Sequence, residues 1–188
     1  MRTKEINLYQ IEEIKEQFPA LFKEILEKNR YFNTDFDWYA DTLSTVQESL
    51  EALGFSNIEI HFSGFGSQGD GANFTASWSY AKDWKEAGFM ESFRPLAEAL
   101  DSLKERSFKI TKGNSRYSHE NTVDFTFYDK EGEETDEDES IVRACKYAMQ
   151  IIYSELEKEY DYLTSEEAIF ETLEANEYWF NEKGDIEN

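Results

Sequence analysis

The first part of the chain places apolar side chains at helical spacing. They recur every three or four positions between residues 8 and 30, and again between residues 37 and 53. Pro19 interrupts the first run. We therefore predict that one helix ends near Gln17 and that a second begins at Pro19, because proline suits the first turn of a helix. Gly54 follows the second run and is expected to end that helix.

The pattern then changes to strict alternation, which is typical of half-buried strands. Four segments alternate in this way: residues 57–62, 73–80, 107–111 and 122–128. The glycine-rich stretch 64–71 would join the first two, and residues 112–121 ("KGNSRYSHEN") would join the last two. The sequence therefore predicts two β-hairpins.

Helical spacing returns after each hairpin. It predicts a helix over 82–106, a long helix over about 138–160 and a short one over about 165–175, while 177–185 ("EYWFNEKGD") would form a final strand or a docked tail. Strand pairs set between helices indicate an α+β fold. We expect an antiparallel sheet of about four strands, formed by the two hairpins, with helices packed on one face, in a single domain over residues 1–188.

Charge is the strongest global feature of the sequence. The chain has 19 Lys and Arg against 41 Asp and Glu, a net charge of −22, and residues 129–188 form a strongly acidic helical part with 5 basic and 20 acidic residues. Such a surface repels nucleic acid and anionic membranes, so direct binding to either is not expected. It attracts a basic partner, such as a nucleic-acid-binding protein. The alternative is that the acidity only keeps an aromatic-rich protein soluble.

The remaining composition indicates a cytoplasmic protein. Cys145 is the only cysteine, so the chain forms no internal disulfide. No apolar run reaches the length of a signal peptide or of a membrane-spanning helix. We expect the protein in the cytoplasm, without a membrane partner.

The stretch "HFSGFGSQGDGANF" at 61–74 has the glycine spacing of a phosphate-binding loop, but it lacks the other features that such a loop needs. Asp70 stands where such a loop needs lysine, and a strand follows where a helix is required. The glycines suit a hairpin instead, with Asp70–Gly71 at its corner and Gly64 and Gly66 on one strand face. That bare face is either filled internally, for instance by a ring from the 82–106 helix, or offered to a partner.

"FSGFGSQGDGANF" and the preceding "DWYADTLSTVQESLEALGFSNIEIH" resemble a family of small phage and prophage proteins that are often labelled antitoxins of a toxin–antitoxin stability system. "YSHE" at 117–120 and "NEYWFNEKG" at 176–184 are similar to later motifs of that family. The likeness covers roughly residues 37–80 and these two islands. It implies a phage or mobile-element origin. Gly66 departs from the family pattern, in which tryptophan is expected at this position.

Two further interpretations concern chemistry at the hairpin ends. His119, Asp70 and Gln68, with His61, offer the parts for a small-ligand site or for acid–base catalysis. One cysteine and two histidines do not make a closed zinc site. The acidic run 129–139 lacks the EF-hand pattern, although weak calcium binding is left open.

These observations favour a non-enzymatic phage or mobile-element protein that binds and inhibits a host protein with a basic surface. The host target would be a nuclease, a CRISPR or restriction factor, or a toxin, and the acidic surface would mimic nucleic acid. An antitoxin and a small-ligand binder or enzyme are the alternatives, and a homodimer is left open. No catalytic residue, cofactor or metal is assigned. The predicted binding surface consists of Phe65, Gly66, Ser67, Gln68, Gly69, Asp70, Tyr117, His119, Glu155, Glu159, Glu166, Glu167 and Trp179.

Overall fold

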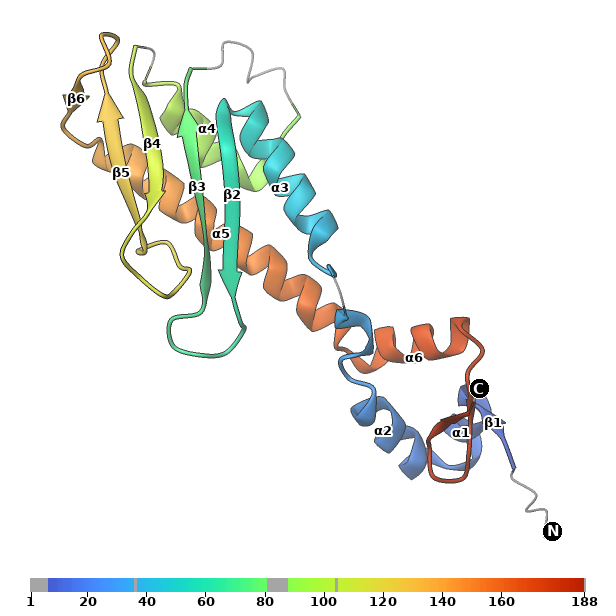
Figure 1. The fold of residues 1–188 in the computed structure, drawn as a ribbon. Helices are drawn as coiled ribbons and strands as arrows, with labels where there is room; N and C mark the ends of the chain where they lie inside the picture. The colour runs from blue at the N-terminus through green and yellow to red at the C-terminus, as the bar shows by residue number, and fades with distance from the viewer. Residues whose placement is uncertain (1–6, 36, 81–87, 104, 188) are drawn as a thin grey trace. The chain divides into compact units, whose positions relative to one another are not determined.

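The computed structural model describes residues 7–35, 37–80, 88–103 and 105–187 (Figure 1). The elements follow in the order β1 (Tyr9–Gln10), α1 (Ile11–Gln17), α2 (Pro19–Lys28), η1 (Phe32–Thr34), α3 (Ala40–Ala52), β2 (Phe55–Ser63), β3 (Gly71–Trp78), η2 (Glu91–Phe93), α4 (Arg94–Leu100), β4 (Ser107–Lys112), β5 (Val123–Tyr128), β6 (Glu134–Thr135), α5 (Glu139–Leu163), α6 (Glu166–Ala175), β7 (Trp179–Phe180) and β8 (Ile186–Glu187). The α+β class is confirmed.

The chain divides into two compact units, a subdivision that the pattern of the sequence does not predict. The smaller unit contains Met1–Trp38 and Lys158–Asn188, and the larger unit contains Tyr39–Glu157. Helix α5 contributes residues to both.

The larger unit contains an antiparallel sheet with the strand order β2-β3-β4-β5-β6. Both expected hairpins are present, as β2–β3 and β4–β5, and Ser77 of β3 lies opposite Lys109 of β4. The expected number of about four strands is only roughly matched. Part of the acidic run forms the short strand β6 beside Phe127 and Tyr128.

The inner face of this sheet is aromatic and is covered by helices. In Figure 1, α3, α4 and α5 lie on one side of the sheet. Phe108, which is 1% exposed, is central to this layer: its ring lies 5.3 Å from that of Trp78 and 5.2 Å from that of Phe127, centroid to centroid. Trp78 donates a hydrogen bond from Nε1 to the Leu53 carbonyl at 2.8 Å. The strand periodicity thus buries one row of rings, and the row on the opposite face is polar.

In the described part of the segment 82–106, where one helix was expected, the α-helix is limited to α4. Residues 81–87 lie outside the described part, and from Gly88 onward the chain is irregular until η2 and α4, which ends at Leu100. Pro95 lies in the first turn of α4. Because proline lacks an N–H and clashes with the preceding turn, a regular helix does not run through this position.

The smaller unit combines α1, α2, α6 and the end of α5 with a three-stranded sheet, in the order β1-β7-β8. The expected helix break between Gln17 and Pro19 is confirmed. Strand β1 was missed and was assigned to the first helix, because it exists only through pairing with β7 at the other end of the chain. The core of the unit consists of Ile11, Ile14, Ile25, Leu26, Ile169, Leu173 and Phe180.

Within the acidic run, individual carboxylates have structural roles. Asp129 Oδ1 accepts hydrogen bonds from the backbone N–H groups of Glu131 and Glu133, which closes the turn between β5 and β6. Asp138 precedes α5, and its Oδ1 accepts from the Ser140 hydroxyl at 2.6 Å and from the Ser140 N–H at 3.0 Å. These bonds, chiefly that from the hydroxyl, hold the pKa of Asp138 below its ordinary value, and Arg106 adds to the effect.

Replacing Asp138 by alanine is expected to lower the free energy of unfolding by about 1 kcal/mol at pH 7, because α5 loses its N-terminal cap. A carboxyl group whose pKa is lowered on folding stabilises above its unfolded pKa of about 4 and loses that contribution as the pH falls through the folded pKa. The difference in the free energy of unfolding between wild type and Asp138→Ala should therefore become smaller below about pH 4. Urea unfolding at several pH values measures this difference. Asp136→Ala is the matched control, since the contact of Asp136 with Arg106 is through its backbone carbonyl.

Candidate functional site

The glycine-rich connection between β2 and β3 is a structured loop with a reverse turn at its end. The Asp70 N–H donates to the Ser67 carbonyl at 3.1 Å, and the Asp70 carboxylate accepts from the Ser67 N–H at 2.7 Å. Gly69 has a φ of +98°, which this turn requires and which glycine adopts at no steric cost. The turn therefore spans 67–70. The expected Asp70–Gly71 corner is wrong, since Gly71 is already the first residue of β3.

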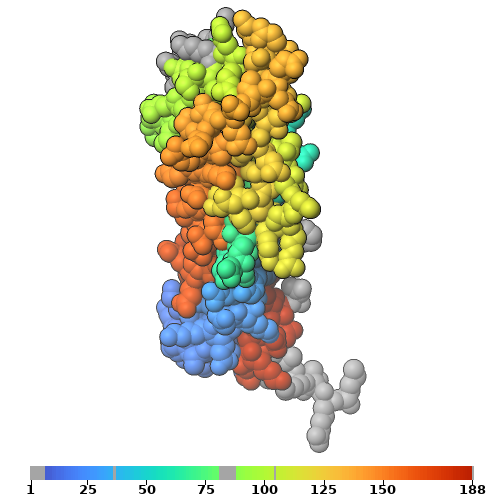
Figure 2. Space-filling view, turned by 90° about the vertical axis from the view of Figure 1, so that its left-hand side faces the viewer, coloured from blue at the N-terminus to red at the C-terminus, as the bar shows by residue number. Residues whose placement is uncertain are grey.

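The second hairpin's loop, residues 113–121, packs directly against this glycine-rich loop. A Cβ atom on Gly69 would lie 3.0 Å from the Tyr117 ring, and one on Gly71 would lie 2.5 Å from the Cβ of His119. Figure 2 shows the two loops side by side on the surface. The glycines thus allow one loop to approach the other closely, and the atoms nearest to a Cβ at Gly69 or Gly71 belong to Tyr117, Ser118 and His119 of the 113–121 loop.

The other end of the glycine loop contacts helix α5. The Tyr153 hydroxyl donates to the Gly64 carbonyl at 3.2 Å, and the Phe65 and Tyr153 rings stack with their centroids 5.4 Å apart. Burial raises the pKa of Tyr153, and the negative charges of Glu157 and Asp70 raise it further. Gly64 and Gly66 were expected on a strand face. They lie in the loop, because β2 ends at Ser63.

A buried polar network fixes the second loop over the outer face of the sheet. The Thr122 hydroxyl accepts from Asn73 Nδ2 at 2.7 Å and from the His119 N–H at 3.1 Å, and it donates to the His119 carbonyl at 2.6 Å. Asn73 is fully buried. His119 Nδ1 accepts from the Asn121 N–H at 3.2 Å, so the ring proton lies on Nε2. His119 and Asp70 both serve as loop-forming residues in this arrangement.

Gly66 lies at the open part of the loop, in a backbone conformation that favours glycine. Its φ is +122°, in the region that favours glycine, and a Cβ atom added to it would meet no atom within 4 Å. There is space for a large side chain, but tryptophan at this position would require a different backbone conformation. The exposed edge of the loop consists of Gly66, Ser67 and Gln68.

The fit between the loops makes Gly71 sensitive to the smallest substitution. Gly71→Ala places a methyl group 2.5 Å from His119 Cβ and 3.0 Å from His119 Cα, so the 113–121 loop has to move. We expect a loss of about 1–3 kcal/mol in the free energy of unfolding and a shift of the His119 ring resonances in NMR spectra. Gly88→Ala is the control, since no atom lies within 4 Å of that position. Equal stability of the two variants would contradict the loop packing.

The smaller unit holds a second candidate surface, an acid-lined depression of about 250 Å³ between α1 and the end of α6. Its lining includes Glu12, Glu174 and Glu177. The Glu174 carboxyl is hydrogen-bonded to that of Glu12. This hydrogen bond is the main reason why the pKa of Glu174 is raised. Glu174 and Glu177 also lie at the C-terminal end of α6, where the helix dipole is negative, so the local potential favours a bound cation.

An exposed ridge of acids continues along α6. Glu167, Glu171 and Glu174 are all exposed, at spacings of four and three residues that place them on one helix face. Like charges at this spacing destabilise a helix by a few tenths of a kcal/mol per pair. The smaller unit carries 8 Lys and Arg against 18 Asp and Glu, so few cations are available to offset this repulsion.

The predicted binding residues fall into two groups. Phe65–Asp70, Tyr117 and His119 are brought together by the two loops, and Glu155 lies in the same unit. The smaller unit contains Glu159, Glu166, Glu167 and the 44% exposed Trp179. The prediction missed Glu12, Glu174 and Glu177 as a group. Only the contact between α1 and α6 brings Glu12 to the other two, and no spacing in the sequence signals it.

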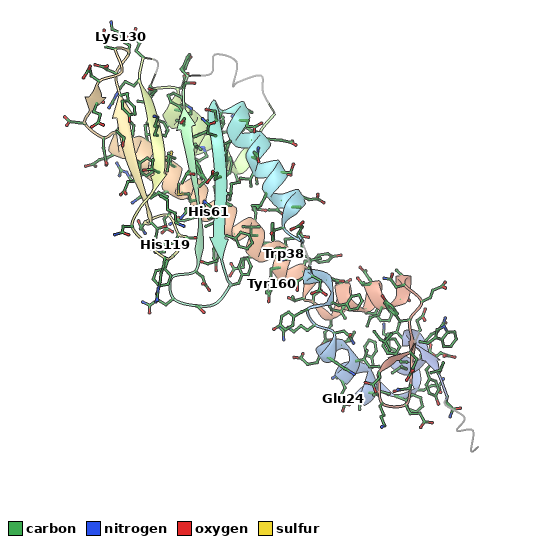
Figure 3. The ribbon with its side chains drawn as sticks, in the orientation of Figure 1. Glu24, Trp38, His61, His119, Lys130 and Tyr160 are labelled. Atoms are coloured by element: carbon green, nitrogen blue, oxygen red, sulfur yellow. The ribbon has the colours of Figure 1, made fainter. Side chains whose placement is uncertain are left out.

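His61 lies on the outer face of the sheet, where it is labelled in Figure 3 together with His119 at the sheet end. It lies opposite Asn73, and its Nε2 is 3.8 Å from Glu59 of the same strand. A shallow depression of about 390 Å³ runs along this face and includes Lys109 and Lys112. Among the described residues, no cluster of three or more potential ligands can hold a metal ion.

These features define a class: a strongly acidic α+β protein with two closely packed loops on one unit and an acid-lined depression on the other. The chain belongs to the family described as domain of unknown function DUF8835, whose model matches residues 38–166. The match covers the whole larger unit, including both loops. Comparison with curated proteins gives no match, and neither does comparison with solved structures. In the part of the chain that is described, no helix combines the length and the apolar character needed to cross a membrane.

Proposed function

We propose that this protein is a phage or mobile-element protein that binds a host protein through a basic surface of that partner and thereby inhibits it. The observation that carries the proposal is the acid-lined depression formed by Glu12, Glu174 and Glu177 at the negative end of α6. A lysine or arginine side chain of the partner fits this chemistry. The phage origin is supported by the resemblance of the 61–74 stretch to phage proteins.

The energetics of the depression favour binding over stability. Two carboxyl groups that interact closely repel each other when both are ionised. The pKa of Glu174 is raised chiefly by its hydrogen bond to Glu12, and the negative charge of Glu12 adds to the effect. A partner's cation between Glu12 and Glu174 would remove the repulsion and gain a charge-assisted hydrogen bond. The acids are therefore better placed for a complex than for the free protein.

Both units carry excess negative charge, which also favours binding to a basic partner. The larger unit carries 11 Lys and Arg against 23 Asp and Glu, so it is also strongly negative. Long-range attraction of this kind accelerates association with a basic protein. A nuclease, a CRISPR or restriction factor, or a toxin presents such a surface, and the acidic protein would occupy it in place of nucleic acid. An antitoxin would use the same surface on a toxin.

The loop pair supports the small-ligand alternative less well. Asp70 is bonded to Ser67, and Nδ1 of His119 is bonded to Asn121, so both groups have partners within their own loops. The rigid edge Gly66–Gln68 instead suits a second contact with a protein partner, because its shape is fixed before binding.

The test compares wild type with Glu12→Gln/Glu174→Gln in a pull-down from host lysate, with elution by a salt gradient. We expect a basic, nucleic-acid-handling protein that elutes before about 1 M salt, where the Debye length is about 3 Å, and about tenfold weaker capture by the variant, equivalent to about 1.4 kcal/mol. Glu48→Gln/Glu51→Gln on α3 removes the same charge elsewhere and is the control. The captured protein is then assayed for inhibition by the wild type and by each variant. Equal capture by both variants, or capture that salt does not weaken, would refute the proposal.

A further inference from the structure

The five-stranded sheet has two edges, and they differ strongly. At one edge β6 has only two residues, Glu134 and Thr135, within the acidic run. At the other edge β2 has nine residues, Phe55–Ser63. Short and charged edges resist pairing with another chain, whereas a long edge strand offers a row of unpaired backbone groups. Any added strand therefore belongs at β2.

In the part of the chain that the structure describes, the apolar side of β2 is incompletely covered. Ile58 and Ile60 face the helix layer but are only half-buried, whereas Phe74 and Ala76 on the neighbouring strand are 0% and 6% exposed. Inward-facing isoleucines remain partly accessible when the strand beyond them is missing. A further strand beside β2 would extend the sheet and reduce this exposed apolar surface.

The sequence of β2 is complementary to itself in antiparallel pairing. With Ile60 of one copy opposite Ile60 of another, Glu59 lies opposite His61 and Ile58 lies opposite Phe62. A carboxylate and an imidazole then meet on the outer face, where Glu59 and His61 are 75% and 37% exposed, and apolar side chains meet on the inner face. Directly opposed pairs of both kinds stabilise antiparallel strands. A shift by one residue would place Glu59 opposite Ile60 or Phe62 of the other copy.

We propose that two copies of this chain associate through β2 in this register, about a two-fold axis at Ile60, to form one continuous antiparallel sheet. The bulge between Ser56 and Glu59, with Asn57 at a φ of +53°, marks where pairing begins. Such an isologous contact closes on itself and stops at a dimer. Because each copy has a net charge of −22, salt strengthens this association, whereas it weakens the binding of a basic partner.

Cysteine cross-linking tests the register. Cys145 is fully buried, so a cysteine introduced by Ile60→Cys is the accessible thiol in the native protein. Directly opposite residues have Cα atoms about 4.5–5.5 Å apart, within the range of a disulfide. Mild oxidation should give a covalent dimer of Ile60→Cys that reductant reverses. Thr126→Cys, on an inner strand, should give only background.

A mixture of two different cysteine variants tests the pairing register more stringently. Glu59→Cys with His61→Cys should cross-link to each other several times more than either variant does alone. Sedimentation of the unmodified protein is the second measurement, with dimer increasing between about 0.1 M and about 1 M salt. His61→Glu should raise the dimer Kd roughly tenfold, and Glu59→Lys/His61→Glu should restore it. Equal cross-linking at positions 60 and 126, or a monomer at every salt concentration, would overturn the proposal and leave the partner-binding proposal untouched.

Discussion

Replacing Phe108 by alanine is expected to lower the free energy of unfolding of the larger unit by about 3–5 kcal/mol. Phe108 is 1% exposed and contacts four other aromatic rings on the inner face of the sheet, those of Phe55, Trp78, Phe125 and Phe127. The substitution removes the ring that contacts all four of these side chains and leaves a cavity in the core. A loss of this size is a large fraction of the stability of an ordinary domain.

The cysteine of the same unit provides the readout. Cys145 is fully buried, and burial raises the pKa of its thiol, so an alkylating reagent reaches it only when the unit opens. Urea unfolding and the rate of Cys145 alkylation should both report the destabilisation by Phe108→Ala. Tyr147→Ala is the control, because that ring is 51% exposed on α5. If Phe108→Ala and Tyr147→Ala gave equal urea midpoints, Phe108 would not be central to the core.

Replacing Thr122 by valine is expected to cost about 2–4 kcal/mol, although the two side chains have nearly the same shape. The hydroxyl takes part in three hydrogen bonds, two to the backbone of His119 and one to the buried amide of Asn73. Valine leaves the Asn73 N–H without its partner in a site that is closed to solvent. The expected cost exceeds that of an average hydrogen bond because the unpaired donor stays buried.

Thr126→Val is the matched control for this prediction, since Thr126 lies on the same outer face of β5 at a half-buried position. Urea unfolding gives the stability difference, and hydrogen exchange of residues 113–121 shows whether the loop loosens. Combining Thr122→Val with Asn73→Ala should cost less than the sum of the two single changes, because they remove a shared bond. Additive costs would show that the two side chains are not coupled.

Loop packing has a consequence for the binding surface on the larger unit. The edge Gly66–Gln68 stays exposed while the 113–121 loop holds the residues behind it through Gly69 and Gly71. A variant that loosens this loop, such as Thr122→Val, should therefore weaken a contact at that edge without touching it. The acid-lined depression of the smaller unit is independent of this loop, so Glu12→Gln/Glu174→Gln separates the two surfaces.

The sequence by itself determined the α+β class, the helix break at Pro19, both hairpins and the long helix α5. These features depend on local rules: the spacing of apolar side chains, the fixed φ of proline and the turn preference of glycine. For the same reason it identified the 61–74 stretch as a hairpin rather than a phosphate loop, since Asp70 and the following strand are visible in the sequence.

Only the tertiary structure decided the features that join distant parts of the chain. Strand β1 exists because Tyr9 pairs with Phe180, and Gly71 is constrained because His119 lies against it. Glu12 joins Glu174 only through the packing of α1 on α6. A local pattern carries no record of such contacts, because the energy that selects them is shared between residues far apart in sequence.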